Sequence, residues 1–259
     1  PFLLLSLRFF LSGTLAIAIA KLLGQKIQFS KADWLSIFIF GICQNTIYLG
    51  LNFVAMQSID ASVAAIIASM LPIVVTIFSW IFFKEKLSLL GILGLTLGIL
   101  GIIIIMQTNL TSKLDSNGVV LCLFGVLALS IATIVIRKSS GQNILMMVGL
   151  QMLVGSFTLF PLSLALETWQ ISWTYSLIAS FLYTTIFPGI VATLIWFKLL
   201  HFIGPIKAAS FHFLNPFFGV LIANLILSEQ LLLQQIFGVI LVMVAILMLQ
   251  ISNITKKET

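Results

Sequence analysis

Only a few side chains in this sequence of 259 residues could carry out chemistry, and several of them lie inside long apolar runs. Arg8 is the first, about two turns into the first run. If that run spans a membrane, a central charge costs roughly 2.5–3.5 kcal/mol on insertion scales and usually faces a cavity or a partner. Arg8 is therefore a candidate contact for an anionic or carboxylate-bearing substrate. The alternative is a side chain that extends to the outer surface or pairs with helix-end carbonyls.

A second set of polar residues shares one helical face. Asn45, Tyr48 and Asn52 are separated by three and four positions, which places them on the same side of a helix, and Gln44 adjoins them. Polar groups that face lipid are unfavourable, so this face is expected to point inward. Hydrogen bonding to a substrate in a wet cavity is the preferred interpretation. Interhelical bonds, worth only about 0.6 kcal/mol on average, are the alternative.

His212 and Asn215 lie just before Pro216, and a proline leaves a backbone carbonyl without its donor one turn earlier. His212 is the group inside an apolar run that titrates nearest physiological pH. A histidine bonded to a neighbouring helix is favoured over a proton relay. No Asp or Glu occupies the middle of a run, so facilitated diffusion or exchange is expected rather than strong proton or sodium coupling.

Metal and cofactor chemistry is not indicated. His201 and His212 have no Cys or carboxylate at ligand spacing, and Cys43 and Cys122 lie in apolar runs, so we expect no metal and no cofactor. No Ser/His/Asp set converges, and the protein is not expected to be an enzyme. Glycines recur at three and four positions in one run, which indicates close helix packing rather than a phosphate loop: Gly91, Gly94, Gly98 and Gly101.

Composition predicts the elements that position these residues. The chain is 61% hydrophobic and 8% charged, whereas soluble domains average about 45–50% apolar and about 25% charged. Lipid must surround most of it, and backbone groups in lipid must pair internally. The apolar runs are longer than barrel strands, which predicts an all-α polytopic transmembrane helix bundle. Nine spans are expected: Phe2–Ala20, Trp34–Val54, Ala61–Phe83, Leu89–Met106, Gly118–Ile136, Ile144–Leu166, Trp173–Leu200, Ala208–Leu227 and Leu231–Ile251.

An internal repeat appears when the chain is shifted by 144 positions. The matched pairs are Pro72 with Pro216, Glu85 with Glu229, Leu87 with Leu231, and Gly94 with Gly238. The two prolines and two glutamates are candidate gating or structural residues, and Gly238 joins the packing glycines. The polar face maps onto Gly189, Ala192 and Trp196. A polar half that faces a small and aromatic half suits an amphipathic substrate, with Trp196 among the contacts.

The first copy covers residues 1–107 with four helices, and the second covers 117–251 with five, followed by a polar cytoplasmic tail at 252–259. The missing counterpart would precede residue 1, so the chain is expected to lack the first of ten helices. Basic residues support a fixed orientation: eleven fall in loops on one side and only Lys113 on the other. That bias predicts two inverted five-helix units, a cytoplasmic C-terminus and a cell (inner or plasma) membrane location.

This pattern resembles the EamA domain family of the drug/metabolite transporter superfamily. The resemblance rests on Pro1 followed by Arg8 in the first span. It rests also on Ala64-Ala65 with Pro72, Trp80, Glu85, Leu87 and Gly94, and on Ala208-Ala209 with Pro216, Glu229, Leu231 and Gly238. It implies ten helices in two inverted repeats and the export or exchange of small metabolites or drugs.

The predicted function is therefore secondary transport of small amphipathic solutes by alternating access, as exporter, exchanger or facilitator. A passive pore or lipid scramblase is the alternative, and an intramembrane enzyme is less favoured. The expected partners are a small-molecule substrate and the lipid bilayer. A homodimer is left open. The net charge of +6 is spread over short loops rather than gathered on one face, so no nucleic-acid partner is expected.

Overall fold

The computed structural model describes residues 1–59, 61–106, 115–169, 171, 174–218, 233–252 and 254–256. Within them, five helical stretches are long and apolar enough to cross a membrane: Phe2–Leu22, Lys31–Ala55, Ser116–Val135, Ile144–Leu166 and Tyr175–Ile203. Three shorter apolar helices accompany them: Leu71–Phe83, Leu89–Ile104 and Ile236–Ile251. The predicted polytopic helix bundle is confirmed. The predicted spans Leu89–Met106 and Ile144–Leu166 match helices α6 and α8 at both ends.

The chain divides into two compact units that cut across the sequence repeat. Unit 1 comprises Pro1–Val54 and Ile131–Gly204, and unit 2 comprises Ala55–Ser130 and Pro205–Thr259. Each unit therefore combines helices from both copies of the repeat.

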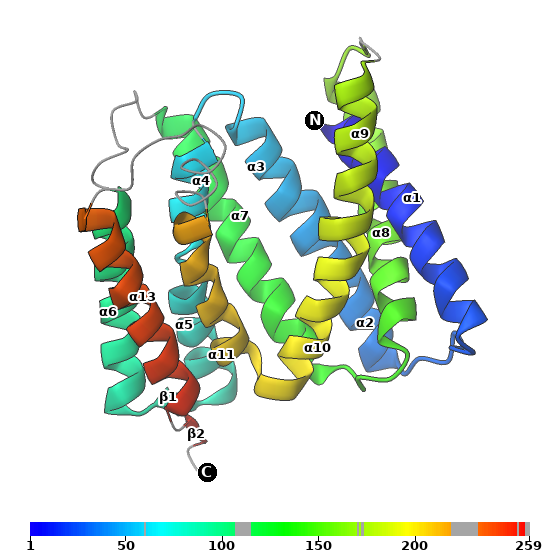
Figure 1. Cartoon of the computed structure of the whole chain (residues 1–259). Helices are drawn as coiled ribbons and strands as arrows, with labels where there is room; N and C mark the ends of the chain where they lie inside the picture. Colours follow the sequence, from blue (N-terminus) through cyan, green and yellow to red (C-terminus); the bar gives the residue numbers. More distant parts are fainter. Residues whose placement is uncertain are drawn as a thin grey trace. The chain divides into compact units, whose positions relative to one another are not determined.

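Unit 1 is organised around a pair of long helices that pack lengthwise, α1 (Phe2–Leu22) and α8 (Ile144–Leu166) (Figure 1). Buried Ala16, Ala20, Met146 and Ile190 form one of its apolar clusters. The other helices follow the chain in this order: α2 (Lys31–Phe40), η1 (Gly41–Leu49), α3 (Gly50–Ala55), the end of α7 (Ser116–Val135), η2 (Ile136–Lys138), α9 (Tyr175–Thr184), η3 (Thr185–Ala192) and α10 (Thr193–Ile203).

Two of these elements, η1 and η3, are π-helices in the middle of continuous helical runs. The shift of 144 positions places Gly41, the first residue of η1, on Thr185, the first residue of η3. Pro188 lies inside η3 and has no N–H to give to the helical ladder. π-helical turns are rare and occur frequently at functional sites. The predicted spans Trp34–Val54 and Trp173–Leu200 therefore exist, but each has an altered hydrogen-bond register at its centre.

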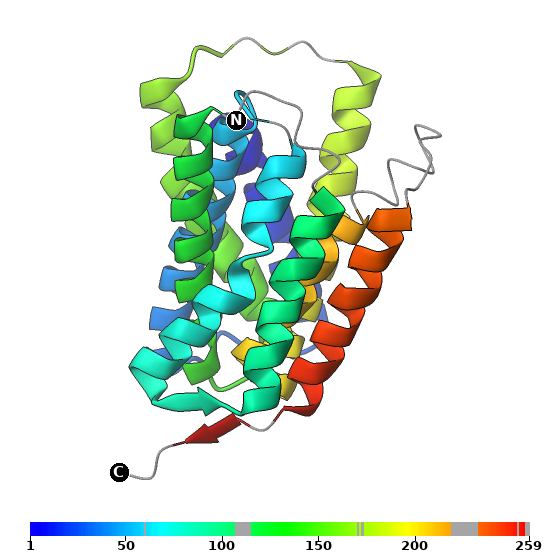
Figure 2. The ribbon, with the colours of Figure 1, turned by 90° about the vertical axis from the view of Figure 1, so that its left-hand side faces the viewer.

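In unit 2, α6 (Leu89–Met106) and α13 (Leu233–Ile251) lie side by side (Figure 2). Strands β1 (Glu85–Leu87) and β2 (Ile254–Lys256) pair antiparallel next to them, with Glu85 opposite Lys256. The other described elements are α4 (Ala61–Ala68), α5 (Leu71–Phe83), the first part of α7, α11 (Pro205–Ala209), the 3₁₀-helix η4 (Ser210–Leu214) and a helical stretch at 215–218.

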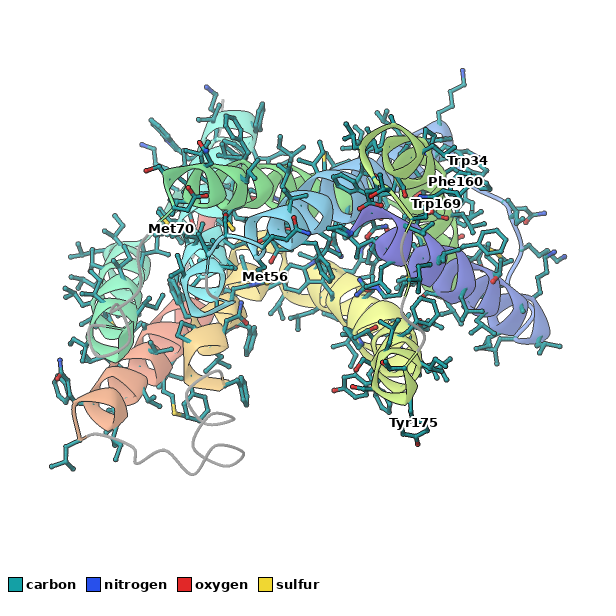
Figure 3. All side chains as sticks on the ribbon, turned by 90° about the horizontal axis from the view of Figure 1, so that it is seen from above. Trp34, Met56, Met70, Phe160, Trp169 and Tyr175 are labelled. Atoms are coloured by element: carbon teal, nitrogen blue, oxygen red, sulfur yellow. The ribbon has the colours of Figure 1, made fainter. Side chains whose placement is uncertain are left out.

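The prediction of one unbroken helix over Ala61–Phe83 is wrong. A turn at Ser69 and Met70 separates α4 from α5, and Pro72 stands at the start of α5. Because Pro72 has no N–H, it cannot donate to the carbonyl one turn earlier. Just before the break, the Ser69 amide and hydroxyl both donate to the Ala65 carbonyl, at 3.0 and 2.7 Å. Met70, at the break, is 40% exposed (Figure 3). The last part of the predicted span Ala208–Leu227, beyond residue 218, lies outside the described residues.

Aromatic side chains mark the ends of helices in unit 1. Trp169 follows α8 and stacks near Phe160, with ring centroids 6.1 Å apart. Tyr175 begins α9 and points outward, 90% exposed, while Trp34 lies in the first turn of α2 (Figure 3). Tryptophan and tyrosine are enriched where membrane meets water. These positions are therefore consistent with helices that cross a bilayer.

Candidate functional site

Arg8 is buried within unit 1, with 7% of its surface exposed. Its guanidinium carbon lies 4.8 Å from the centre of the Phe9 ring, and its Nε has no hydrogen-bond partner among the described residues. The neighbouring Leu7 and Phe10 are 42% and 48% exposed. Arg8 therefore points away from the face that they present. Pairing with helix-end carbonyls, the alternative left by the sequence, is not observed in the described part of the chain.

Contacts on either side of Arg8 fix its level in the α1–α8 pair. The Ser6 hydroxyl donates to the Ser156 carbonyl at 3.0 Å. Further along, a Cβ added to Gly13 would lie 2.9 Å from the Gly149 carbonyl oxygen, so the two backbones nearly touch there. Arg8 lies between these two contacts, at the level of the middle of α8.

Helix η3 also packs on α1 close to Arg8. Ser12, one turn after Arg8, donates its hydroxyl to the Thr185 carbonyl at 2.9 Å. A Cβ on Gly189 would lie 2.8 Å from the Ser12 Oγ, which explains why a side chain is absent there. Residues four apart share a helical face, so Arg8 and Ser12 lie on the side of α1 that η3 contacts.

Asn45 does not project into open space. It is 1% exposed, and its Nδ2 donates to Gln151, to the backbone carbonyl at 3.0 Å and to Oε1 at 2.5 Å. Gly155 allows this approach, because a Cβ there would lie 2.4 Å from the Asn45 Cβ. This is the interhelical bonding that the sequence left as the alternative to cavity lining.

The rest of the predicted polar face is also in unit 1. The Asn52 side chain donates to the Tyr48 carbonyl within its own helical run at 2.7 Å. Tyr48, Gln44 and Trp196 are each partly buried. The Gln44 Oε1 atom is buried without a hydrogen-bond partner among the described residues.

Sequence reasoning missed Gln151, which is fully buried in the middle of α8. Its Oε1 accepts from Asn45, while its Nε2 has no partner within the described chain. Native interiors pair the large majority of their buried side-chain polar atoms. Unit 1 thus holds unsatisfied donors at Arg8 and Gln151 and an unsatisfied acceptor at Gln44. A signal was available, because Gln151 is an isolated amide inside an apolar run.

The remaining candidates belong to unit 2. His212 is in η4, and its Nδ1 lies 3.2 Å from the Asn215 Nδ2. Pro216 follows in the helical stretch at 215–218, and Pro72 begins α5. Glu85 is 6% exposed in β1. Its repeat partner Glu229 lies outside the described residues. The structure therefore gathers six of the eight predicted substrate contacts in unit 1 and the other two in unit 2.

The predicted packing glycines lie at helix contacts of unit 2. A Cβ on Gly101 would lie 2.8 Å from the Gly238 carbonyl oxygen, and one on Gly94 would lie 3.0 Å from the Ala245 carbonyl oxygen. A Cβ on Gly98 would enter the buried Phe213 ring at 2.4 Å. Gly91 faces the Leu87 side chain and the Ser252 hydroxyl. Among the residues described, no three His, Cys, Asp or Glu side chains converge as a metal site would require.

Comparisons with known proteins match most of the chain. The family model described as the EamA-like transporter family matches residues 1–107 and 116–251. A solved crystal structure superimposes with a TM-score of 0.79 at 15% identity, covering 96% of this chain and 86% of the other. At that identity the likeness concerns the fold alone.

Relatives with transporter names cover most of the chain. The uncharacterized transporter YvbV of Bacillus subtilis is 24% identical over 99% of this chain and 85% of its own length. An uncharacterized transporter of Archaeoglobus fulgidus is 28% identical over 95% of this chain and 87% of its own length. A WAT1-related chloroplastic protein of Arabidopsis thaliana is 26% identical over 95% of this chain and 62% of its own.

Proposed function

Because the chain belongs to the EamA-like transporter family, we propose that it is a secondary transporter of small amphipathic solutes that works by alternating access. The observation that carries this proposal is the set of unsatisfied buried polar atoms in unit 1, on Arg8, Gln44 and Gln151. They lie in membrane-spanning helices, where an unpaired polar group is unfavourable. A solute that enters from water supplies the missing hydrogen bonds and leaves again.

The two π-helices are the expected sites of backbone rearrangement during alternating access. Helix η1 packs on α8 and η3 packs on α1, and the shift of 144 positions relates α1 to α8. A π-turn differs from an α-turn by one residue of hydrogen-bond register, so a return to α-helix rotates the residues beyond it. Reciprocal changes at η1 and η3 would move Asn45 and Gly189 relative to Gln151 and Ser12. This is a route by which two comparable halves exchange access around one site.

The same proposal includes orientation. The loop residues Lys21–Lys31, Lys84–Lys86 and Arg137–Lys138 are placed in the cytoplasm, together with the C-terminus, on the basis of the positive-inside bias. Single cysteines at Asp115 or Glu167, in a background without Cys43 and Cys122, should react with an impermeant thiol reagent in intact cells. Cysteines at Lys26 or Lys86 should react only after permeabilisation. The reverse pattern would overturn the orientation.

The transport proposal is tested by counterflow in vesicles that contain the purified chain. Vesicles are loaded with a mixture of unlabelled metabolites, and entry of each labelled solute is followed. A carrier that works by alternating access accelerates entry further when the same solute is present inside. Flux that is equally fast without internal solute would indicate a passive pore. Lipid transfer between leaflets without solute flux would indicate a scramblase, and either result rejects the proposal.

A further inference from the structure

We propose that Arg8 is the anion-binding residue of this transporter and that the transported solute carries a carboxylate group. This inference rests on the proposed transport function and adds the chemical class of the substrate. Arg8 combines three properties that a structural arginine rarely combines: it is buried, it is unpaired, and it lies midway along a contact between spanning helices. A buried charge without a partner is strongly unfavourable. A ligand that binds it relieves that cost.

Unit 1 has no carboxylate left to neutralise Arg8. Its acidic residues are Asp33 and Glu167. Asp33 accepts hydrogen bonds from the Ser140 amide at 2.6 Å and from the Ser30 hydroxyl at 2.7 Å, at the start of α2. Glu167 accepts from the amides of Phe2 and Leu3 at the start of α1. Both acids are engaged at helix ends, and Arg8 has no ion pair among the described residues. The countercharge is therefore expected from a bound molecule.

The surroundings of Arg8 favour a solute carboxylate over a lipid phosphate. Leu7 and Phe10 occupy the exposed face of α1, whereas Arg8 is turned to the side that η3 contacts. A headgroup would have to reach past these apolar residues. The planar guanidinium fork matches a carboxylate in bidentate geometry, and the Phe9 ring lies against it, with the guanidinium carbon 4.8 Å from the ring centre. The Gln44 Oε1 and Gln151 Nε2 atoms of the same unit have no hydrogen-bond partner among the described residues, and they are suited to neutral polar groups of the same solute.

The binding test measures thermal unfolding of the full chain, delipidated in a sugar-based detergent. The probes are small aliphatic, aromatic and amino-acid carboxylates, each compared with its primary amide. We expect at least one carboxylate to raise the melting temperature and its amide to have no effect. Stabilisation by amides alone, or by no carboxylate, would overturn the assignment. So would stabilisation by phosphatidylglycerol that depends on Arg8 and is matched by no carboxylate, because the site would then hold a lipid headgroup.

Substitutions separate binding from structure. Arg8→Met introduces the residue found at the repeat-equivalent position, Met152. It should raise the melting temperature without ligand, since an unpaired charge is removed, and abolish the carboxylate effect. Arg8→Lys keeps the charge but loses the fork, and the apparent affinity should fall about tenfold. Lys31→Gln, which removes an exposed cation, is the control and should change neither value. An Arg8→Met protein that is less stable and still responds to the carboxylate would show that Arg8 is structural.

Counterflow distinguishes this proposal from the transport function itself. Accelerated exchange of neutral or cationic solutes, with no exchange of carboxylates, would leave the transporter intact and reject the role of Arg8. Absence of protein-dependent exchange for every solute would instead reject the transport function. Exchange of the stabilising carboxylate by the wild-type protein and its loss in Arg8→Met would support both.

Discussion

The α1–α8 pair of unit 1 and the α6–α13 pair of unit 2 are each built from two helices related by the same shift of 144 residues. In unit 2 the pair meets through glycines. The shift converts Gly94 into Gly238 and Gly101 into Ala245, so the contact of Gly94 with Ala245 and that of Gly101 with Gly238 are exchanged by the repeat. The α6–α13 interface is therefore close, apolar and nearly symmetric.

The α1–α8 pair has a similarly close backbone contact, but it carries polar side chains. Gly13 and Gly149 still let the backbones meet, but hydroxyls of Ser6 and Ser156 lie 3.3 Å apart across the same interface. Near the centre of this interface lies Arg8 of α1, and the repeat-equivalent residue in α8 is Met152. One repeat-related pair therefore acts as an apolar support, while the other holds polar groups that the protein itself does not satisfy. The two repeat-related helix pairs therefore differ in the side chains at their contacts more than in how closely their backbones approach.

The largest loss of stability is expected when the apolar α6–α13 interface is disrupted. In Gly101→Leu the new side chain meets the Gly238 carbonyl oxygen, which belongs to a helix backbone and cannot move aside cheaply. Overpacking typically costs about 1–3 kcal/mol, and a clash with backbone lies at or above the top of that range. Fluorescence-detected gel filtration should show little monodisperse protein. Leu100→Phe adds bulk at a position that is 52% exposed, and a comparable loss there would show that bulk alone is responsible.

A smaller loss of stability should follow when the hydrogen bond between Asn45 and Gln151 is removed. Asn45→Ala removes the donor to Gln151, and a buried acceptor left unpaired costs about 1–3 kcal/mol. A double-mutant cycle with Gln151→Met isolates the bond between the two side chains, because the Gln151 carbonyl still accepts from Asn45 in that variant. In membrane proteins such cycles give about 0.6 kcal/mol on average, and a similar coupling is expected from thermal unfolding. Strictly additive effects would contradict this assignment of the Asn45 amide.

The sequence was sufficient for the helices and for part of the site. Apolar runs bounded by turn residues located α6 and α8 at both ends, because hydropathy and chain length constrain a spanning helix strongly. The π-helices were not foreseen, since both registers present a similar pattern of apolar residues. Spacing placed Asn45 on an inward face, but it did not identify Gln151 as its partner. That partner depends on which helices pack together, and on a close approach permitted by Gly155.

The smallest expected effect depends on pH and concerns the contacts at one end of each helix pair. At the end of the α6–α13 pair, strands β1 and β2 form backbone hydrogen bonds. In unit 1, Glu167 accepts from the amides of Phe2 and Leu3 at 2.7 and 2.9 Å. Burial raises the pKa of Glu167, but hydrogen bonds from the Ser163 hydroxyl and from these amides lower it below its usual value.

A carboxyl group with a lowered pKa stabilises the folded state above its unfolded pKa, about 4.3 for glutamate, and loses that contribution as the pH falls through its folded value. Hydrogen exchange followed by mass spectrometry, corrected for the intrinsic pH dependence, should therefore show the first turn of α1 losing protection as the pH falls below about 4. The β1 segment should lose much less over the same range. Glu167→Gln should open α1 at neutral pH and remove most of this pH dependence, since no charge remains to titrate. Equal pH dependence in Glu167→Gln and wild type would show that another group controls the end of α1.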